Sequence, residues 1–119
     1  MMGAVVIRWG ASIPVREGKG LEVLSSAVMR FEELRKDGRI QAHREYFSLT
    51  GGEGGFMLIE GEVAELQAIL VEEQTVKMNA QAAAVVHDFH VQLYGGGDDE
   101  AVQSLVTSYV AGLKELGYL

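Results

Sequence analysis

The sequence contains no cysteine, which excludes disulfides, thiolate metal sites, iron–sulfur clusters and thiol nucleophiles. Basic residues are also scarce, because ten Lys and Arg stand against seventeen Asp and Glu and give a formal net charge of −7. So acidic a chain lacks the general attraction for phosphate groups that nucleic-acid binding needs, and we expect no nucleic-acid partner. No serine lies in a nucleophile-elbow pattern, so any chemistry must come from histidine, carboxylate, arginine and tyrosine groups.

Long apolar runs are missing as well. No stretch approaches the roughly 18–20 apolar residues of a membrane-spanning helix, and we expect no membrane partner. The first residues do not have the layout of a signal peptide, because Arg8 and Trp9 interrupt the apolar stretch, and we expect a cytoplasmic protein. Pro14 is the only proline, and no Pro/Ser-rich linker divides the chain. Its 119 residues therefore predict a single domain, residues 1–119.

The sequence does hold enough apolar residues for a packed core, since 48% of it is hydrophobic and 23% is charged. The charge is unevenly spread: residues 60–119 carry ten acidic and two basic side chains, whereas residues 1–59 carry seven and eight. We interpret the acidic part as solvated surface, and the association of opposite surfaces is the alternative.

Alternation and helical spacing predict the order β-α-β-β-α-β, followed by a C-terminal helix. Strands are expected at residues 4–9, 39–49, 56–60 and 84–94, and helices at 17–37, about 63–70, a shorter piece around 75–81, and about 98–117. Gly38 is expected to end the first helix in the left-handed conformation, and Gly61 to end the third strand. Residues 50–55 and 95–97 are glycine-rich turns without the features of a phosphate loop. Asp98 is a good N-cap for the last helix.

This order is the ferredoxin-like pattern of an α+β fold, in which a four-stranded antiparallel sheet carries its helices on one face. By analogy with that fold we expect the strand order 4-1-3-2, with a core over residues 4–94. The other face of such a sheet stays open. Alternation places the first set of polar candidates on that open face: Arg8, Asp88, His90, Gln92 and Tyr94. A face that carries both polar and aromatic side chains suggests a lined cavity or a dimer interface.

Asp88 and His90 are the candidate catalytic residues. Two positions apart on a strand, they share one face at roughly 6.5–7 Å. A carboxylate at that place can orient an imidazole and raise its pKa, which would make His90 a general base. The alternative is that the two side chains only satisfy each other at a dimer interface. His87 and His90 would chelate a metal on a helix but point apart on a strand, so we expect no metal site.

The candidate ligand-binding residues are Arg8, Gln92, Tyr94 and His43. Arg8 lies inside an apolar strand and needs a partner, which is either a substrate carboxylate or Asp88. His43 and Glu45 repeat the imidazole–carboxylate pairing, although polar residues on an edge strand also discourage aggregation. An aromatic pocket could draw on Trp9, Tyr46, Phe47, Phe56 and Tyr94, for which core packing is the alternative.

This layout resembles the dimeric α+β barrel superfamily, in which two ferredoxin-like sheets pack face to face. The resemblance covers residues 4–94 and rests on the element order; residues 9–34, 38–40 and 55–61 look like small uncharacterised bacterial members. It implies a homodimer with a pocket between sheet and helices. Members include cofactor-independent monooxygenases, lactone isomerases, haem enzymes and proteins of unknown activity. No catalytic motif of a named enzyme aligns with this sequence, and we expect no cofactor.

Three functions follow as hypotheses. The first is a homodimer that binds a small, partly apolar molecule between sheet and helices. The second is a cofactor-independent monooxygenase or isomerase that uses His90 with Asp88, assisted by Arg8. The third is a protein-interaction module that docks through its C-terminal helix, whose apolar stripe over residues 101–113 needs a partner surface.

Overall fold

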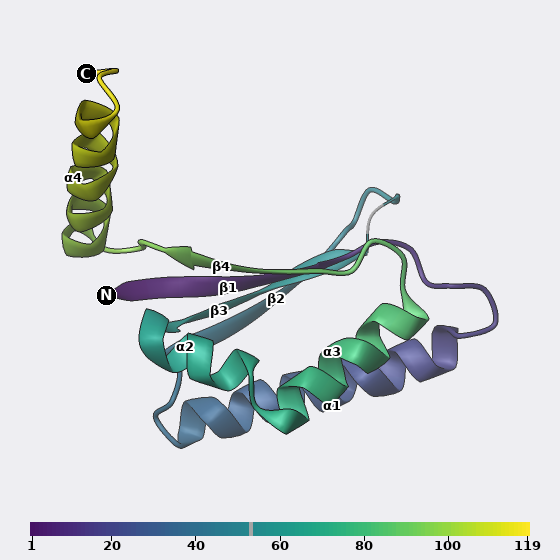
Figure 1. Cartoon of the computed structure of the whole chain (residues 1–119). Coiled ribbons are helices and arrows are strands. Elements are labelled where there is room, and N and C mark those ends of the chain that lie inside the picture. The colour runs from purple at the N-terminus through teal and green to yellow at the C-terminus, as the bar shows by residue number, and fades with distance from the viewer. Residues whose placement is uncertain (53) are drawn as a thin grey trace.

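The computed structural model describes every residue of the chain except Glu53, which belongs to the turn expected at 50–55. Its elements follow the expected order (Figure 1). They are β1 (Met2–Trp9), α1 (Glu17–Lys36), β2 (Ala42–Phe47), β3 (Gly55–Glu62), α2 (Val63–Leu70), α3 (Glu73–Val85), β4 (His90–Gly95) and α4 (Asp99–Glu115). None of the helices in the described part combines the length and apolar character that a membrane span requires.

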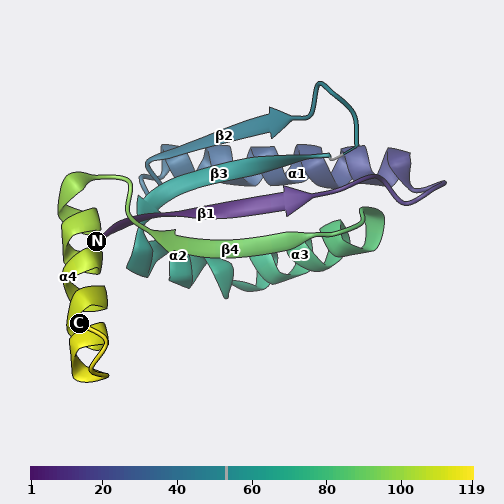
Figure 2. The same ribbon diagram turned by 90° about the horizontal axis from the view of Figure 1, so that it is seen from above.

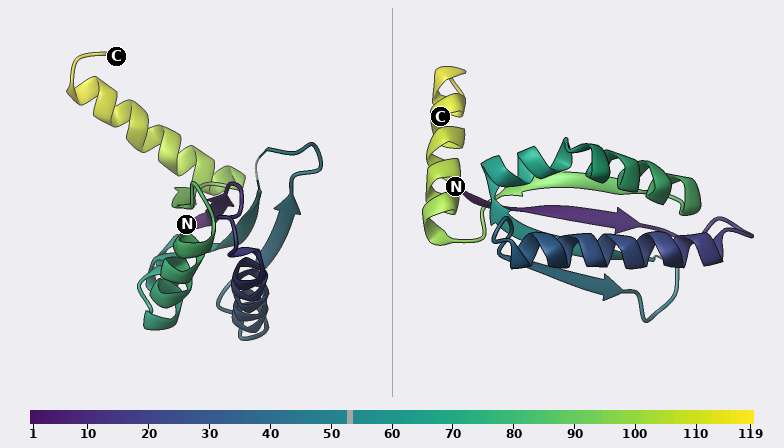
Figure 3. Two further views of the ribbon diagram at one scale, coloured as in Figure 1. Left: turned by 90° about the vertical axis from the view of Figure 1, so that its right-hand side faces the viewer. Right: turned by 90° about the horizontal axis from the view of Figure 1, so that it is seen from below.

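The four strands form one antiparallel sheet in the order β2-β3-β1-β4, which confirms the predicted strand order. The helices α1, α2 and α3 all cover the same face of this sheet (Figures 1 and 3). No element of the described chain covers the other face, which Figure 2 shows from above. The α+β, ferredoxin-like fold class expected from the sequence is therefore confirmed.

The core lies between the sheet and these three helices. Alternate residues of the two central strands, such as Val5, Ile7 and Ile59, point to the helices and are buried. Phe31 on α1 and Leu66 on α2 meet them from the helix side. Gly38 follows α1 at φ +75°, where a side chain would be strained, so the predicted end of this helix is confirmed.

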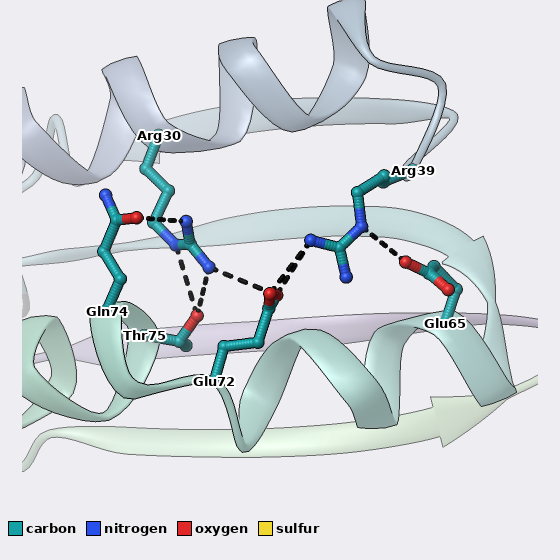
Figure 4. Close-up of polar contacts among 6 residues, drawn as sticks. All are labelled: Arg30, Arg39, Glu65, Glu72, Gln74 and Thr75. Atoms are coloured by element: carbon teal, nitrogen blue, oxygen red, sulfur yellow. Dashed lines mark hydrogen bonds and ion pairs between the residues drawn. The ribbon is translucent and has the colours of Figure 1, made fainter.

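Hydrogen bonds and ion pairs among six polar side chains link the helices to one another (Figure 4). The buried guanidinium of Arg30 on α1 donates to Thr75 Oγ1 at 2.8 and 3.2 Å and to Gln74 Oε1 at 2.8 Å. Arg39, beyond α1, bonds Glu72 at 2.9 and 3.0 Å and Glu65 at 2.5 Å. The hydrogen bonds from Arg39 lower the pKa of Glu72, which keeps this carboxylate charged between the two arginines. The junction between α2 and α3 is thereby fixed against α1.

The fourth strand is shorter than the sequence predicts. It begins at His90, whereas the expected strand began at residue 84, and α3 extends through Val85 and is longer than α2. The cause is local: the run Asn79 to Ala84 is rich in alanine, the best helix former, and it overrides the β-branched residues that follow. After the helix, Gly10 N donates to His87 O at 2.8 Å, so residues beyond β1 still pair with this connection.

Two smaller expectations also differ from the structure. Gly61 does not end the third strand, because β3 continues to Glu62 and Gly61 pairs with Gly3 of β1. A glycine is required at position 3, since a Cβ there would lie 2.3 Å from Tyr94 O. The second strand is confined to Ala42–Phe47 and is shorter than the expected range of 39–49.

The last helix, α4, begins as predicted, because Asp98 Oδ1 accepts a hydrogen bond of 2.8 Å from Ala101 N. It projects from the end of the sheet on the side opposite to α1, α2 and α3 (Figures 1 and 3). Only its residue Ala101 is buried within the chain.

Candidate functional site

A pocket of about 370 Å³ lies between the helix-covered face of the sheet and the helices α1 and α3. It is located where β1 ends, α1 begins and α3 ends. Its volume falls within the range of roughly 300–1,000 Å³ that is usual for small-molecule sites. Its apolar lining includes Trp9, Phe47, Met57, Met78, Phe89 and Leu24.

Small residues on the two helices leave room for this pocket. Gly20 and Ala27 line it from α1, and Ala82 lines it from α3. Larger side chains at these positions would fill the space between helix and sheet with core contacts. Arg16 closes the same end of the fold, because its Nη1 donates to Ala84 O at 2.7 Å and holds the last turn of α3 beside the start of α1.

Two aromatic rings form one wall of the pocket. Trp9 and Phe47 meet edge to face, with ring centroids 6.0 Å apart and an angle of 69° between the planes. Gly54 lies directly against the indole, since a Cβ at that position would be 2.2 Å from Trp9 Cδ1 and 2.4 Å from Gly10 O. The close approach of the Gly54 backbone therefore fixes the position of the tryptophan ring, which gives a ligand a preformed flat surface.

The polar side chains of the pocket lie at its rim. Ser12 and Glu17 are exposed, and Asn79 is half-buried. Among the described residues, no histidine, lysine or arginine lines the pocket. Such a site can enclose the apolar body of a small molecule and leave its polar end at the rim, but it offers no buried acid–base pair for catalysis.

Most of the residues that the sequence singled out lie on the open face of the sheet. His90, Gln92 and Tyr94 are exposed there on β4, and Arg8 is exposed beside His90 on β1. Val91 and Leu93 point to the core, so the predicted alternation is correct within this strand. None of these four polar candidates lines the pocket.

Asp88 is placed differently from what we expected. It lies before β4 and has a positive φ of 55°, a conformation that aspartate tolerates better than most residues. It therefore does not share a strand face with His90, and the expectation that both project from one strand is wrong. The expected ion pair between Asp88 and Arg8 does not form either.

His43 faces α1 from the edge strand β2, and its side chain is only 11% exposed. Its Nδ1 lies 2.5 Å from Glu45 Oε1 and its Nε2 lies 2.7 Å from Glu32 Oε2. Burial lowers the pKa of His43, but the hydrogen bonds to Glu32 and Glu45 outweigh burial and raise the pKa above its ordinary value. Arg35 and His43 bond Glu32 and lower its pKa to about 2. This charged cluster ties β2 to α1 and does not reach the pocket.

The sequence pattern did not single out the pocket residues on α1 and α3. Leu24, Met78 and Ala82 have the same helical spacing as core residues, so periodicity assigns them to the core. Trp9 and Phe47 are the exception, because both were candidates for an aromatic pocket. Within the described residues, no group of three or more His, Cys, Asp and Glu side chains is placed to hold a metal ion.

Known proteins share this fold at low sequence identity. A dimeric protein of unknown function from Bacteroides fragilis, described as ferredoxin-like, matches with a TM-score of 0.57 and 13% identity over 78% of this chain and 94% of its own. A conserved protein from Methanosarcina mazei matches with a TM-score of 0.61 and 16% identity over 79% and 92%. SnoaB from Streptomyces nogalater, a cofactor-independent oxygenase, matches with a TM-score of 0.58 and 9% identity over 82% and 93%.

No protein-family model matches the chain, and no curated protein matches its sequence. At these identities the likeness concerns the fold alone. It confirms, at that level, the ferredoxin-like fold expected from the sequence.

Proposed function

We propose that the chain binds a small, largely apolar molecule in the pocket between the sheet and the helices α1 and α3. The supporting observation is a preformed volume of about 370 Å³ with an aromatic wall and polar groups only at its rim. Glu17, at the first turn of α1, would meet the polar end of the ligand. Aromatic and aliphatic contacts then supply most of the affinity, and the rim sets the orientation.

We further propose that the molecule acts as a homodimer through the open face of its sheet. Large apolar side chains are exposed on that face, among them Tyr46, Phe56 and Tyr94, at 46%, 38% and 43%. Tyr46 and Phe56 stack there with ring centroids 4.8 Å apart. A patch of this kind is typical of an association surface. The protein of the same fold from Bacteroides fragilis is described as dimeric, which fits this proposal.

A catalytic role for His90 with Asp88 has less support. His90 projects from the open face of the sheet, Asp88 leaves that strand, and neither lines the pocket. We therefore favour ligand binding over a monooxygenase or isomerase reaction at these two residues.

The pocket can be tested with the protein's own fluorescence. Trp9 is the only tryptophan of the chain and lines the pocket, so its emission reports directly on an apolar aromatic probe such as N-phenyl-1-naphthylamine. We expect saturable quenching of Trp9 emission. The Ala82→Leu variant, which adds three carbon atoms to the lining, should weaken binding at least about tenfold, because an overfilled site must expel the probe or distort.

Ala80→Leu is the matched control for this experiment. It makes the same substitution on the same helix, but residue 80 is exposed and does not line the pocket. It should bind the probe as the unchanged protein does. Unchanged Trp9 emission, or equal binding by the two leucine variants, would show that the pocket is not a binding site.

A further inference from the structure

The helix α4 is an arm that protrudes from the rest of the fold. The radius of gyration is 16.7 Å, whereas a compact chain of this length has about 13.5 Å by the usual scaling. Leu105 lies over Gly95, and Ala101 in the first turn is the only residue of the helix that is buried within the described chain. Helices in proteins gain most of their stability from packing of an apolar face, so a helix in this position calls for an external partner.

One side of α4 carries a regular apolar stripe. It consists of Val102, Val106, Tyr109, Leu113 and Leu116, which follow one another at intervals of four, three, four and three residues. This is the spacing of a helix seam that packs against another surface. The opposite side carries Glu100, Thr107 and other polar residues, so the helix has a clear inner and outer side.

The area of the stripe is large enough for a stable contact. Tyr109 is 70% exposed and Leu116 is 73% exposed, and Tyr118 after the helix is 77% exposed. A large aromatic side chain offers ~150–250 Å², so these residues and the valines together present several hundred Å² of apolar surface. That is the scale of one partner's share, about 800 Å², in a standard protein interface.

The position of α4 indicates which surface it meets. The arm stands on the open side of the sheet, beyond the end where β1 begins (Figures 1 and 2). A second copy that packs on the open face is therefore next to the arm. The charges agree: α4 has Asp99 in its first turn beside the stripe, while Arg8 on the open face forms no ion pair among the described residues.

From these observations we infer that α4 packs its apolar stripe against the open sheet face of a second copy of the chain. The inference rests on the homodimer of the proposed function and goes beyond it, since it adds an arm from each copy to the interface. Two arms exchanged in this way would bury both the apolar stripe and the stacked rings of Tyr46 and Phe56.

Charge substitutions on the arm test this inference by analytical ultracentrifugation. Tyr109→Glu places a charge within the stripe and should raise the dissociation constant of the dimer at least tenfold. Thr107→Glu adds the same charge to the polar side, two residues away, and should leave the dimer unchanged. Both residues are exposed and far from the core, so circular dichroism should show the same fold for each variant.

A cross-linking experiment locates the partner surface. A photoreactive benzoylphenylalanine at position 109, in a mixture of isotope-labelled and unlabelled protein, should cross-link to peptides of β1, β3 or β4 of the other copy. Cross-links only within one chain, or only to the outer side of α1 and α3, would overturn the inference.

The outcomes separate this inference from the proposal on which it rests. A dimer that is weakened by Phe56→Glu on the open face but not by Tyr109→Glu would refute the role of the arm and retain the face-to-face dimer. A monomer at micromolar concentration would refute both. Binding of the probe beside Trp9 is measured independently and is unaffected by either result.

Discussion

Removing one hydroxyl group from the helix layer should cost about 2 kcal/mol of stability. Thr75 is only 1% exposed, and its Oγ1 accepts two hydrogen bonds from the buried guanidinium of Arg30. Thr75→Val keeps the shape of the side chain and removes the acceptor. Among the described residues no buried side-chain nitrogen or oxygen lacks a partner, so the substitution would create the first one. Hydrogen bonds to charged groups contribute about 1.5–3 kcal/mol, which sets the expected magnitude.

The free energy of unfolding from urea denaturation checks this prediction, and a double-mutant cycle identifies its cause. Arg30→Met removes the donor, so the additional loss from Thr75→Val should be smaller in that background by about 1–3 kcal/mol. The remaining bonds of Arg30, to Gln74 at 2.8 Å and Glu72 at 3.4 Å, survive in Thr75→Val and therefore limit the loss of stability. A loss below about 0.5 kcal/mol, or strict additivity of the two changes, would refute the view that this bond fastens α1 to α3.

Two further predictions concern charged groups. Because the pKa of His43 is raised in the folded state, its contribution to stability is complete below about pH 6.5 and is lost as the pH rises through the folded pKa. The midpoint of urea unfolding should therefore fall as the pH rises above about 6.5, and His43→Gln should remove this dependence; an equal slope in both proteins would contradict it. Asp98→Ala should destabilise the first turn of α4 by about 1 kcal/mol, seen as faster amide exchange of Ala101, with Asp99→Ala as the control.

The sequence predicts the architecture because the fold depends on periodicities that are strong in this chain. Leu24, Phe31 and Leu34 specify a helix, and Val5, Ile7 and Ile59 specify two strands. Once the order β-α-β-β-α-β is known, few strand arrangements remain, and the observed sheet is one of them.

The error at the fourth strand shows where periodicity fails. Residues 79–85 contain four alanines, which suit a strand pattern or a helix pattern equally well by hydrophobicity. Helix propensity decides between them in favour of α3. The consequence reaches the candidate site, because the end of the helix at Val85 leaves Asp88 in the connection before β4 and not on the strand with His90.

A pocket between sheet and helices was expected from the resemblance, but the small residues that make room for it could not be identified from the sequence, for a different reason. A cavity is a difference between the space that two packed layers enclose and the volume of the side chains that fill it. Gly20, Ala27 and Ala82 come from two helices, and their small size matters only because the fold brings them to the same end of the sheet. No sequence pattern indicates that these three small residues lie close together in space, whereas Trp9 and Phe47 are recognisable as aromatic residues wherever they are placed.

Because side chains alternate along β1, the pocket and the proposed dimer interface lie on opposite faces of the sheet. Ile7 and Trp9 point to the helices and line the pocket, while Arg8 between them points to the open face beside His90 and Phe56. A sheet is one residue thick, so a ligand in the pocket and a second copy on the open face contact opposite sides of the same three residues. Occupation of the pocket can then change association only by shifting the backbone of the sheet, in which hydrogen bonds to β3 and β4 hold β1 in place on both sides. We therefore expect ligand affinity and the dimer dissociation constant to be independent of each other, and a probe that shifts one with the other would show that the sheet moves.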